Sequence, residues 1–273
     1  MKKFLSIIFI IFSISFLYAE DKYYESPMSI YKENYFISGD NGVDGGQVKF
    51  QISAKYALLY PSNIGLYAGY TQISSWHLYE KSAPFYDSNY SPEVFVRFES
   101  KNNFIDNMEI PFVDYIQVSP ICHLSNGKSE MDSRSINTYY GQGQFSIGEH
   151  YNFGINIKIF NYYNTSSKNK DIEVYKGRYE IDTFFKIKST SVVFLDKEEL
   201  HFKFGGYSKN DYDALTDKNK LTKTKGWFCV EAQFRIITSI IQPKLFIQYW
   251  NGYGEVLLDY NKKDESIRAG LVF

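Results

Sequence analysis

The protein is 273 residues long and carries 30 Lys and Arg against 31 Asp and Glu, which gives a formal net charge of -1. This balance argues against a nucleic-acid partner, because nucleic-acid-binding proteins carry clustered positive charge. Aromatic residues make up 19% of the chain, with 25 Tyr and 23 Phe. An ordinary soluble core does not need so much tyrosine, whereas outer-membrane β-barrels use aromatic girdles at both interfaces.

The chain begins with the features of a secretory signal peptide, which we place at residues 1–19. Two lysines precede an apolar run from Phe4 to about Leu17, and Ala19 comes directly before acidic residues. This is the layout of a signal peptide; a retained membrane anchor is the alternative, but the run is short for a spanning helix. Loss of the two lysines would change the formal charge from -1 to -3. No other stretch has the ~18 consecutive apolar residues of a membrane helix. We therefore expect an exported protein, in the periplasm, the outer membrane or outside the cell.

Beyond the signal peptide, the chain changes character near residue 46. Residues 20–45 show no sustained period and end in a glycine-rich turn, so we assign them to an N-terminal segment that precedes one domain over 46–273. From Val48 to Leu58, apolar and polar residues alternate. A period of two is typical of a strand with one wet and one apolar face. The same alternation returns over residues 153–159, 179–187, 200–204 and 230–236.

Such strands suit two all-β folds. In a soluble sandwich the apolar faces point inward, and in a membrane barrel they point outward to lipid. The alternation alone does not separate the two, but export, the tyrosine content and the last strand favour the barrel. That strand, 266–273, ends in Phe273 and resembles the assembly signal of bacterial outer-membrane barrels. At roughly ten residues per strand, we predict an antiparallel transmembrane β-barrel of ten to twelve strands, with extracellular loops at 164–171 and 209–226.

One polar stretch, CHLSNGKSEMDSRSIN at 122–137, has no strand or helix period. His123 and Ser125 are two residues apart, so on an extended backbone they project to the same side. Asn126-Gly127 is a strong turn signal, and an antiparallel return would place Asn137 beside His123. The alternative is a solvated surface loop, because a His-x-Ser pair is common by chance.

These three residue types suit nucleophilic catalysis on an ester. A serine hydroxyl is too weakly acidic to attack unaided, so His123 would take the proton of Ser125 and later deliver it to the leaving alcohol. The side-chain oxygen of Asn137 would accept the other ring N–H of His123 and fix its orientation. Because Asn137 is neutral, it would stabilise the imidazolium less than a carboxylate does.

The polar stretch resembles the active-site segment of the outer membrane phospholipase A family. The resemblance is carried by His123-Leu124-Ser125-Asn126-Gly127, Lys128-Ser129, Ser133-Arg134-Ser135 and Asn137. It extends over most of the mature chain, through VKFQIS (48–53), YTQISSW (70–76), SAPF (82–85), NYSPEVF (89–95) and GYGEVLLDYN (252–261).

The resemblance implies a twelve-stranded barrel in the bacterial outer membrane with a catalytic triad of Ser125, His123 and Asn137 on its lipid-facing wall. It implies hydrolysis of the sn-1 and sn-2 acyl esters of phospholipids and of lysophospholipids, a requirement for Ca²⁺, and activity as a homodimer. Ser133 and the carbonyl of Lys128 match calcium ligands, and Ser82 matches the ligand given to the calcium site of the other subunit. Gln72 matches a residue of the dimer contact within the membrane.

The chain departs from the family pattern at several positions. Lys128 stands where arginine is common in the family. Because the ligand would be the backbone carbonyl, this change of side chain leaves it in place. Glu130 stands where the family has an aspartate of a second calcium site. The sequence therefore does not decide whether this chain has a second calcium site. The span from Gln72 to Ser82 is about two residues shorter than the family pattern. Cys122 is interpreted as a packed thiol rather than a second nucleophile, and with Cys229 it could form one disulfide or remain a free thiol.

Two other classes of protein remain as alternatives to an outer-membrane enzyme. A passive barrel, such as a porin or adhesin, would carry these loop residues by coincidence, and a soluble secreted β-sandwich lipase would need no membrane. The remaining histidines, His77, His150 and His201, have no acid or cysteine at metal-ligand spacing, and we interpret them as surface or lumen residues.

Overall fold

The computed structural model describes residues 27–39, 48–59, 63–100, 112–148, 151–187, 198–206, 225–235 and 243–273. The expected signal peptide at 1–19 and most of the loop expected at 209–226 lie outside this part of the chain. The described elements are β1 (Met28–Ile30), β2 (Tyr35–Gly39), β3 (Val48–Leu59), β4 (Ile64–Trp76), β5 (Phe85–Glu99), β6 (Val113–Ser125), η1 (Glu130–Asp132), β7 (Ser135–Ile147), β8 (Tyr151–Thr165), α2 (Ile172–Lys176), β9 (Tyr179–Ile187), β10 (Glu199–Gly205), β11 (Trp227–Arg235), β12 (Lys244–Tyr253) and β13 (Lys263–Val272).

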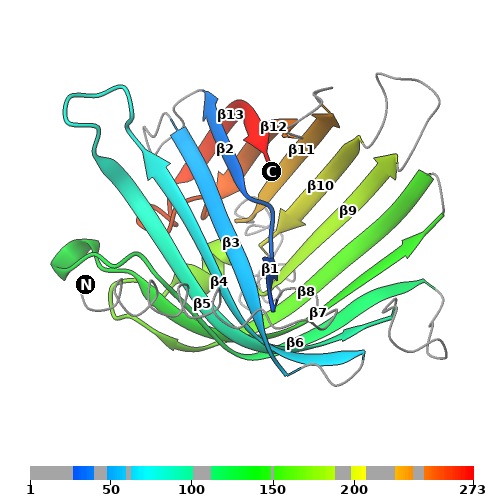
Figure 1. The fold of residues 1–273 in the computed structure, drawn as a ribbon. Coiled ribbons are helices and arrows are strands. Elements are labelled where there is room, and N and C mark those ends of the chain that lie inside the picture. Colours follow the sequence, from blue (N-terminus) through cyan, green and yellow to red (C-terminus); the bar gives the residue numbers. More distant parts are fainter. Residues whose placement is uncertain are drawn as a thin grey trace, which may run out of the picture.

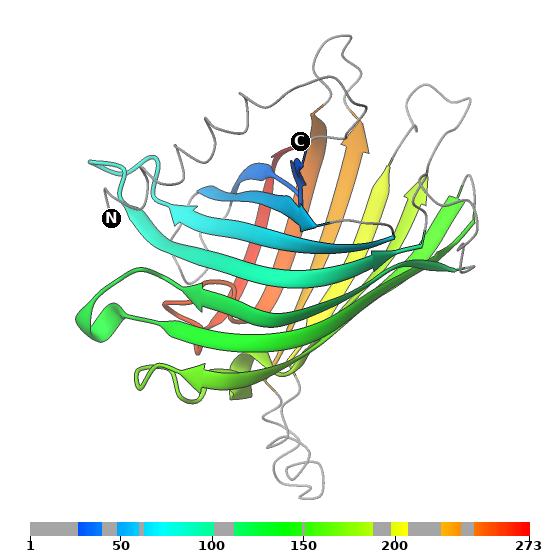
Figure 2. The same cartoon turned by 60° about the horizontal axis from the view of Figure 1, so that its bottom comes forward.

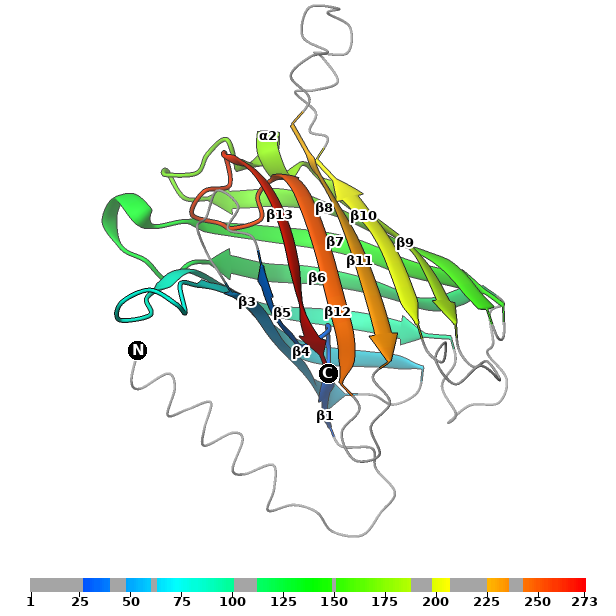
Figure 3. The ribbon, with the colours of Figure 1, turned by 90° about the horizontal axis from the view of Figure 1, so that it is seen from above.

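Strands β2 to β13 form one closed antiparallel ring of twelve strands, seen from the side in Figure 1 and from above in Figure 3. Each strand pairs with the next along the chain, and β13 closes the ring on β2, with Val272 opposite Tyr35 and Arg268 opposite Gly39. No described helix is long and apolar enough to span a membrane. The predicted all-β barrel is confirmed, and the β-sandwich alternative is wrong.

The barrel begins earlier in the chain than the sequence predicts. Within the segment 20–45, β2 pairs with both β3 and β13, and β1 continues along the same edge of β3, with Ile30 opposite Ala54. The assignment of this whole segment to a region before the barrel is therefore wrong. Neither strand is longer than five residues, so each is too short for a period of two to be recognised in the sequence.

The two faces of the strands carry opposite chemistry. Large apolar side chains on the outer face are exposed, among them Ile52, Val96, Val118, Ile159, Phe202 and Ile267. Polar side chains on the inner face are buried, among them Lys49, Ser53, Arg97, Gln117, Glu231, Gln248 and Arg268. A wall with its apolar face outward and its polar face inward is the arrangement of a membrane barrel.

Buried charges inside the barrel are paired. Glu255 enters from the β12–β13 loop, and its carboxylate lies 2.9 Å from Lys49 Nζ and 2.6 Å from Arg268 Nη1, with all three side chains at least 94% buried. The buried Glu231 pairs with Lys203, whose side chain is partly exposed. The two cysteines of the sequence, Cys122 and Cys229, are buried free thiols rather than a disulfide.

Four of the described connections gather at one end of the barrel (Figure 2). They are residues 77–84 between β4 and β5, 126–134 between β6 and β7, 166–178 between β8 and β9, and 254–262 between β12 and β13. The third includes α2 and overlaps the loop predicted at 164–171. This end of the barrel brings together the residues of the polar stretch and several loops distant in sequence.

We predict that Glu255→Gln lowers the free energy of unfolding by about 3–5 kcal/mol, because it removes the carboxylate charge that faces the buried Lys49 and Arg268. The measurement is denaturant unfolding of the protein in detergent, followed by tryptophan fluorescence. Burial opposes the charged form of Glu255, but the two cations hold the pKa of its carboxyl well below the usual range. The stabilisation is therefore present at neutral pH and is lost on acidification, so the difference from wild type should shrink at low pH.

The matched control is Glu80→Gln, which removes the partner of His77 from an exposed pair. Its expected effect is below about 1 kcal/mol, since exposed pairs contribute little. Equal effects of the two substitutions would show that the buried cations do not depend on Glu255.

Candidate active site

The β6–β7 hairpin brings His123 and Asn137 together. They are directly opposite each other in the ladder, and His123 Nδ1 lies 2.7 Å from Asn137 Oδ1. Because an amide oxygen can only accept, Nδ1 carries the hydrogen in this arrangement and Nε2 is left as the acceptor. Ser125 lies two residues further along β6, on the same face of the strand. The antiparallel return predicted for this stretch is confirmed.

The connecting loop 126–134 is held in shape by one buried asparagine. Asn126 Nδ2 donates to the carbonyl of Asp132 at 2.8 Å, and Asn126 Oδ1 accepts the backbone N–H of Arg134 at 2.9 Å. Gly127 follows with a φ of +65°, and a Cβ there would come 3.0 Å from the ring of Tyr90. The Asn-Gly pair thus closes the turn, because asparagine bonds the returning backbone and glycine accepts the left-handed conformation.

A bulge in β6 decides which wall of the barrel the three side chains face. Gln117 and Ser119 point inward and are fully buried, but Pro120 and Ile121 are both exposed, and the pairing with β7 shifts register between Ser119 and Cys122. Cys122 points inward again and packs with a buried cluster. His123 and Ser125 therefore lie on the outer wall.

Asn137 reaches the same wall from β7. Its neighbours Ile136 and Thr138 are buried on the inner face, so Asn137 points outward. The outer surface beside the three residues includes exposed apolar and aromatic side chains. Ile121 and Tyr139 are exposed, Tyr139 stacks on Tyr163 at 6.3 Å between ring centroids, and Tyr90 is opposite Ser125 on β5. The site thus combines a hydroxyl, an oriented imidazole and an apolar outer surface.

The residues matched to calcium ligands lie in two neighbouring loops at this end of the barrel. Lys128 and Ser133 belong to the 126–134 loop, where Ser133 follows the 3-10 turn η1. The ammonium of Lys128 donates to the carbonyl of Tyr86 and lies 5.7 Å from the centre of the Tyr86 ring. Ser82 is exposed in the β4–β5 turn with a φ of +69°. All three offer oxygen atoms, the ligand type that calcium prefers.

Gln72 belongs to a row of polar side chains on the outer face of β4. Tyr70 donates to Gln72 Oε1 at 3.0 Å, Gln72 Nε2 donates to Ser74 Oγ at 3.1 Å, and Ser74 Oγ lies 2.9 Å from Ser88 Oγ on β5. A polar row on the outward wall is unusual where the neighbouring strands expose large apolar side chains.

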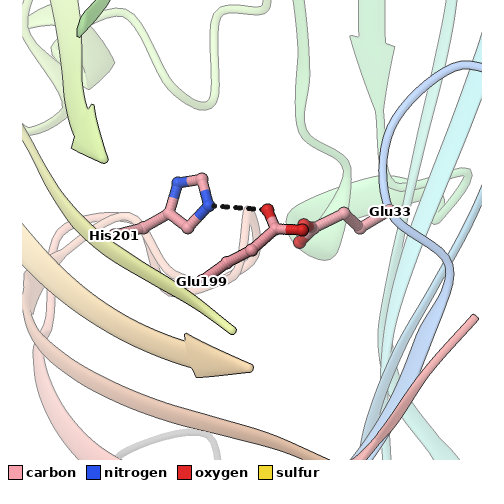
Figure 4. A group of neighbouring side chains, drawn as sticks. All are labelled: Glu33, Glu199 and His201. Carbon is pink, nitrogen blue, oxygen red and sulfur yellow. Dashed lines mark ion pairs between the residues drawn. The ribbon is translucent and has the colours of Figure 1, made fainter. Parts of the chain in front are cut away.

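The sequence did not indicate a second group of titratable residues, which lies inside the barrel. Glu33, Glu199 and His201 bring three possible ligand atoms within 4.8 Å of one another (Figure 4). The carboxylate of Glu199 is already paired with Lys186 at 2.8 Å and with Lys244. The pattern of a lumen-facing strand places His201 inside but cannot reveal these partners from distant strands. We interpret the group as part of the ion network of the lumen, in agreement with the predicted surface or lumen role of His201.

Comparison with known proteins identifies the family. A family model described as phospholipase A1 matches residues 11–273. The chain belongs to the phospholipase A1 family. Its curated relatives include a putative phospholipase A1 of Neisseria meningitidis serogroup B, 28% identical over 238 residues, and phospholipase A1 of Escherichia coli K12, 29% identical over 237 residues. Both matches cover 83% of this chain, but they cover 54% and 69% of the respective relatives, so this chain spans about half the length of the first.

Solved structures of the same fold include outer membrane phospholipase A from Escherichia coli and a calcium-bound dimer of the outer membrane phospholipase of Salmonella typhi. Each superposes with a TM-score of 0.68 at 23% identity and covers 90% of this chain, and the matches cover 98% and 92% of the solved chains. Together with the family, this fold confirms the expected bacterial outer-membrane β-barrel.

We predict that Asn126→Ala destabilises the 126–134 loop while leaving the barrel folded. The substitution removes the side-chain hydrogen bonds to the Asp132 carbonyl and from the Arg134 N–H, each of which contributes about 0.5–1.5 kcal/mol. Hydrogen exchange followed by mass spectrometry should show faster exchange across residues 127–134. Ser129→Ala is the control, because Ser129 precedes η1 without a side-chain capping bond. Unchanged exchange in Asn126→Ala would contradict the role given to this asparagine.

Proposed function

We propose that the protein is a calcium-dependent outer-membrane phospholipase with a Ser125, His123 and Asn137 triad, active as a homodimer. Its substrates would be the sn-1 and sn-2 acyl esters of phospholipids and lysophospholipids. The observation that carries the proposal is the 2.7 Å contact between His123 Nδ1 and Asn137 Oδ1 on the outward wall of the barrel. The names of the relatives, phospholipase A1, support the substrate class.

The triad would act by general base and nucleophilic catalysis. Ser125 Oγ attacks the acyl carbonyl while His123 Nε2 accepts its proton, and the ester bond breaks as His123 returns that proton to the leaving alcohol. Water then attacks the acyl-serine by the same route and releases the fatty acid. Asn137 keeps Nδ1 of His123 as the donor, so that Nε2 always faces the serine as a base.

The outward position of the triad fits a lipid substrate. Because exposed apolar and aromatic side chains lie beside the three residues, the acyl chains of a bilayer lipid could lie against Ile121 and Tyr139 while its ester reaches Ser125. No lipid has to enter the barrel, whose interior holds paired charges. A passive porin or adhesin, the alternative kept from the sequence, would give no role to an imidazole oriented toward lipid.

Calcium would be held by the Lys128 carbonyl and the Ser133 hydroxyl of one chain together with the Ser82 hydroxyl of a second copy. When bound, the cation supplies a positive charge that stabilises the oxyanion of the tetrahedral intermediate. The oxygen donors present fit this ion, and the Lys128 ammonium is engaged by Tyr86 rather than directed at the ligand set. A site divided between two chains would make activity depend on association.

The polar row on β4 supports the second copy. An amide in contact with lipid lacks partners for its remaining hydrogen-bonding capacity, and Gln72 has one N–H more than its bond to Ser74 uses. A partner barrel placed against β4 could accept that N–H and would bring two Ser82 loops to the same interface. One solved structure of the same fold is named as a dimer with bound calcium, which supports the proposal of a second copy.

We predict that Ser125→Ala abolishes release of fatty acid from phospholipid in mixed micelles with calcium, and that Asn137→Ala lowers it by about 10²–10⁴-fold, within the range of general-base catalysis. Asn137→Asp should retain more activity than Asn137→Ala, because a carboxylate also accepts from Nδ1. The heat-modifiable barrel band on a gel serves as the folding control. Full activity of Ser125→Ala would overturn the triad, and a folded wild-type protein that releases no fatty acid would leave the passive barrel as the function.

The shared calcium site gives a complementation test. Ser82→Ala and Ser133→Ala should each lose most calcium-dependent activity, and excess EGTA should remove it from the wild type. Equal mixing of the two variants should restore about a quarter of wild-type activity, because half of the random dimers are mixed and each mixed dimer holds one intact site of two. If mixing restores nothing while calcium still binds each variant, the site is not shared.

A further inference from the structure

The side chains that alternate with the triad point into the barrel and meet there. Leu124 lies between His123 and Ser125, and Ile136 directly precedes Asn137; the two are opposite each other in the ladder. Ile136 belongs to a buried cluster with Ile172 of α2 and with Leu257 and Tyr260 of the β12–β13 loop, and Leu124 packs against this cluster. The inner surface behind the triad is therefore built by two distant loops.

The segment Leu257–Tyr260, which we call the brace, is fixed by three hydrogen bonds to two other parts of the barrel end. The backbone N–H of Leu258 donates to Asp87 Oδ2 at 2.9 Å. The next two residues of the brace are held by side chains: Tyr86 donates to the carboxylate of Asp259, and Tyr260 donates to that of Asp171. The brace is thus bonded to the start of β5 and to the residue that precedes α2.

Further contacts join the brace and the start of its loop to α2. The ring of Tyr175 packs edge-on against Tyr260 at 5.6 Å between centroids. Lys176 Nζ donates to the carbonyl of Gly254 at 3.0 Å, and Gly254 has a φ of +77° that brings the chain over this lysine. Figure 3 shows α2 beside the β12–β13 loop. Burial and the Asp171 carboxylate raise the pKa of Tyr260, so its phenol remains a donor.

The hairpin needs this inner support because its pairing with both flanking strands is interrupted near the triad. Between β5 and β6, the pairing runs from Tyr90 opposite Ser125 to Glu93 opposite Cys122, with no matched pair in between. Pro92 lies in this gap and has no N–H to donate. The β7–β8 pairing shifts register next to Asn137. On the outer side, a fluid lipid offers no fixed packing.

We propose that Leu257 and Tyr260 are positioning residues, which set the geometry of the triad from inside the barrel through Leu124 and Ile136. A loop about 120 residues away in sequence from the triad would then be needed for full turnover. The catalytic part of this inference rests on the proposed function, whereas the support of the hairpin does not.

The first test measures the support itself by hydrogen exchange of the full chain in detergent micelles. Leu257→Ala should accelerate amide exchange within residues 122–126 and 135–138, because it opens a cavity behind Leu124 and Ile136. Val256→Ala is the matched control: Val256 is equally buried in the same loop but lies outside the cluster. Equal exchange of the hairpin in both variants would overturn the brace, whatever the activity of the protein.

The second test measures its consequence for the triad. The rate at which an alkylsulfonyl fluoride labels Ser125 and the kcat for phospholipid should both fall by about 10–100-fold in Leu257→Ala, since a displacement of about 1 Å costs this much. KM and the folded band should be retained, and Leu257→Met should restore most of the rate. Accelerated exchange with unchanged labelling and kcat would overturn the positioning role. A wild-type protein that neither reacts with the probe nor hydrolyses lipid would instead overturn the proposed function. The support of the hairpin by the brace would still be tested by the hydrogen-exchange experiment.

Discussion

A strand in lipid must have every backbone N–H and C=O paired by another strand, because the hydrocarbon offers no donor or acceptor. Here that requirement is met at the junction of β2 and β13, where the two ends of the sheet join. With the ring closed, each strand has one face toward lipid and one toward the interior. The separation of apolar from charged side chains, and the possibility of a lipid-facing site, both follow from this closure.

Closure also creates an interior that must neutralise its own charges. The inner faces place Lys49, Arg268 and Glu231 where little water reaches them, and each is paired with an opposite charge. One of the required carboxylates, Glu255, comes from a loop rather than a strand. The loop that supplies this charge continues directly into the brace behind the triad. Stability of the interior and geometry of the site thus depend on the same short segment.

Much of this arrangement could be predicted from local sequence. The period of two predicts the strands, and Asn126-Gly127 predicts the hairpin that places Asn137 opposite His123. These features depend on residues that are near one another in the chain. The short β2, in contrast, becomes a strand only because β3 and β13 flank it, which no local pattern records.

The contacts that complete the site are equally invisible to local patterns. The brace meets Leu124 and Ile136 from more than a hundred positions away, and the partners of Glu199 come from β9 and β12. Nothing in the spacing of these residues predicts which side chains will meet across the barrel. The roles assigned to the triad and calcium residues remain proposals drawn from the resemblance and the geometry.

The bulge at Pro120 and Ile121 acts as a one-residue phase shift in β6. Before it, even-numbered positions such as Val118 face lipid, and after it odd-numbered positions such as His123 do. A strand without that extra residue would still carry His123 and Ser125 in the same order. It would, however, turn the imidazole and the hydroxyl into the lumen, out of reach of any bilayer lipid. The contact of this hairpin with lipid therefore depends on the number of residues in β6 as much as on their identity.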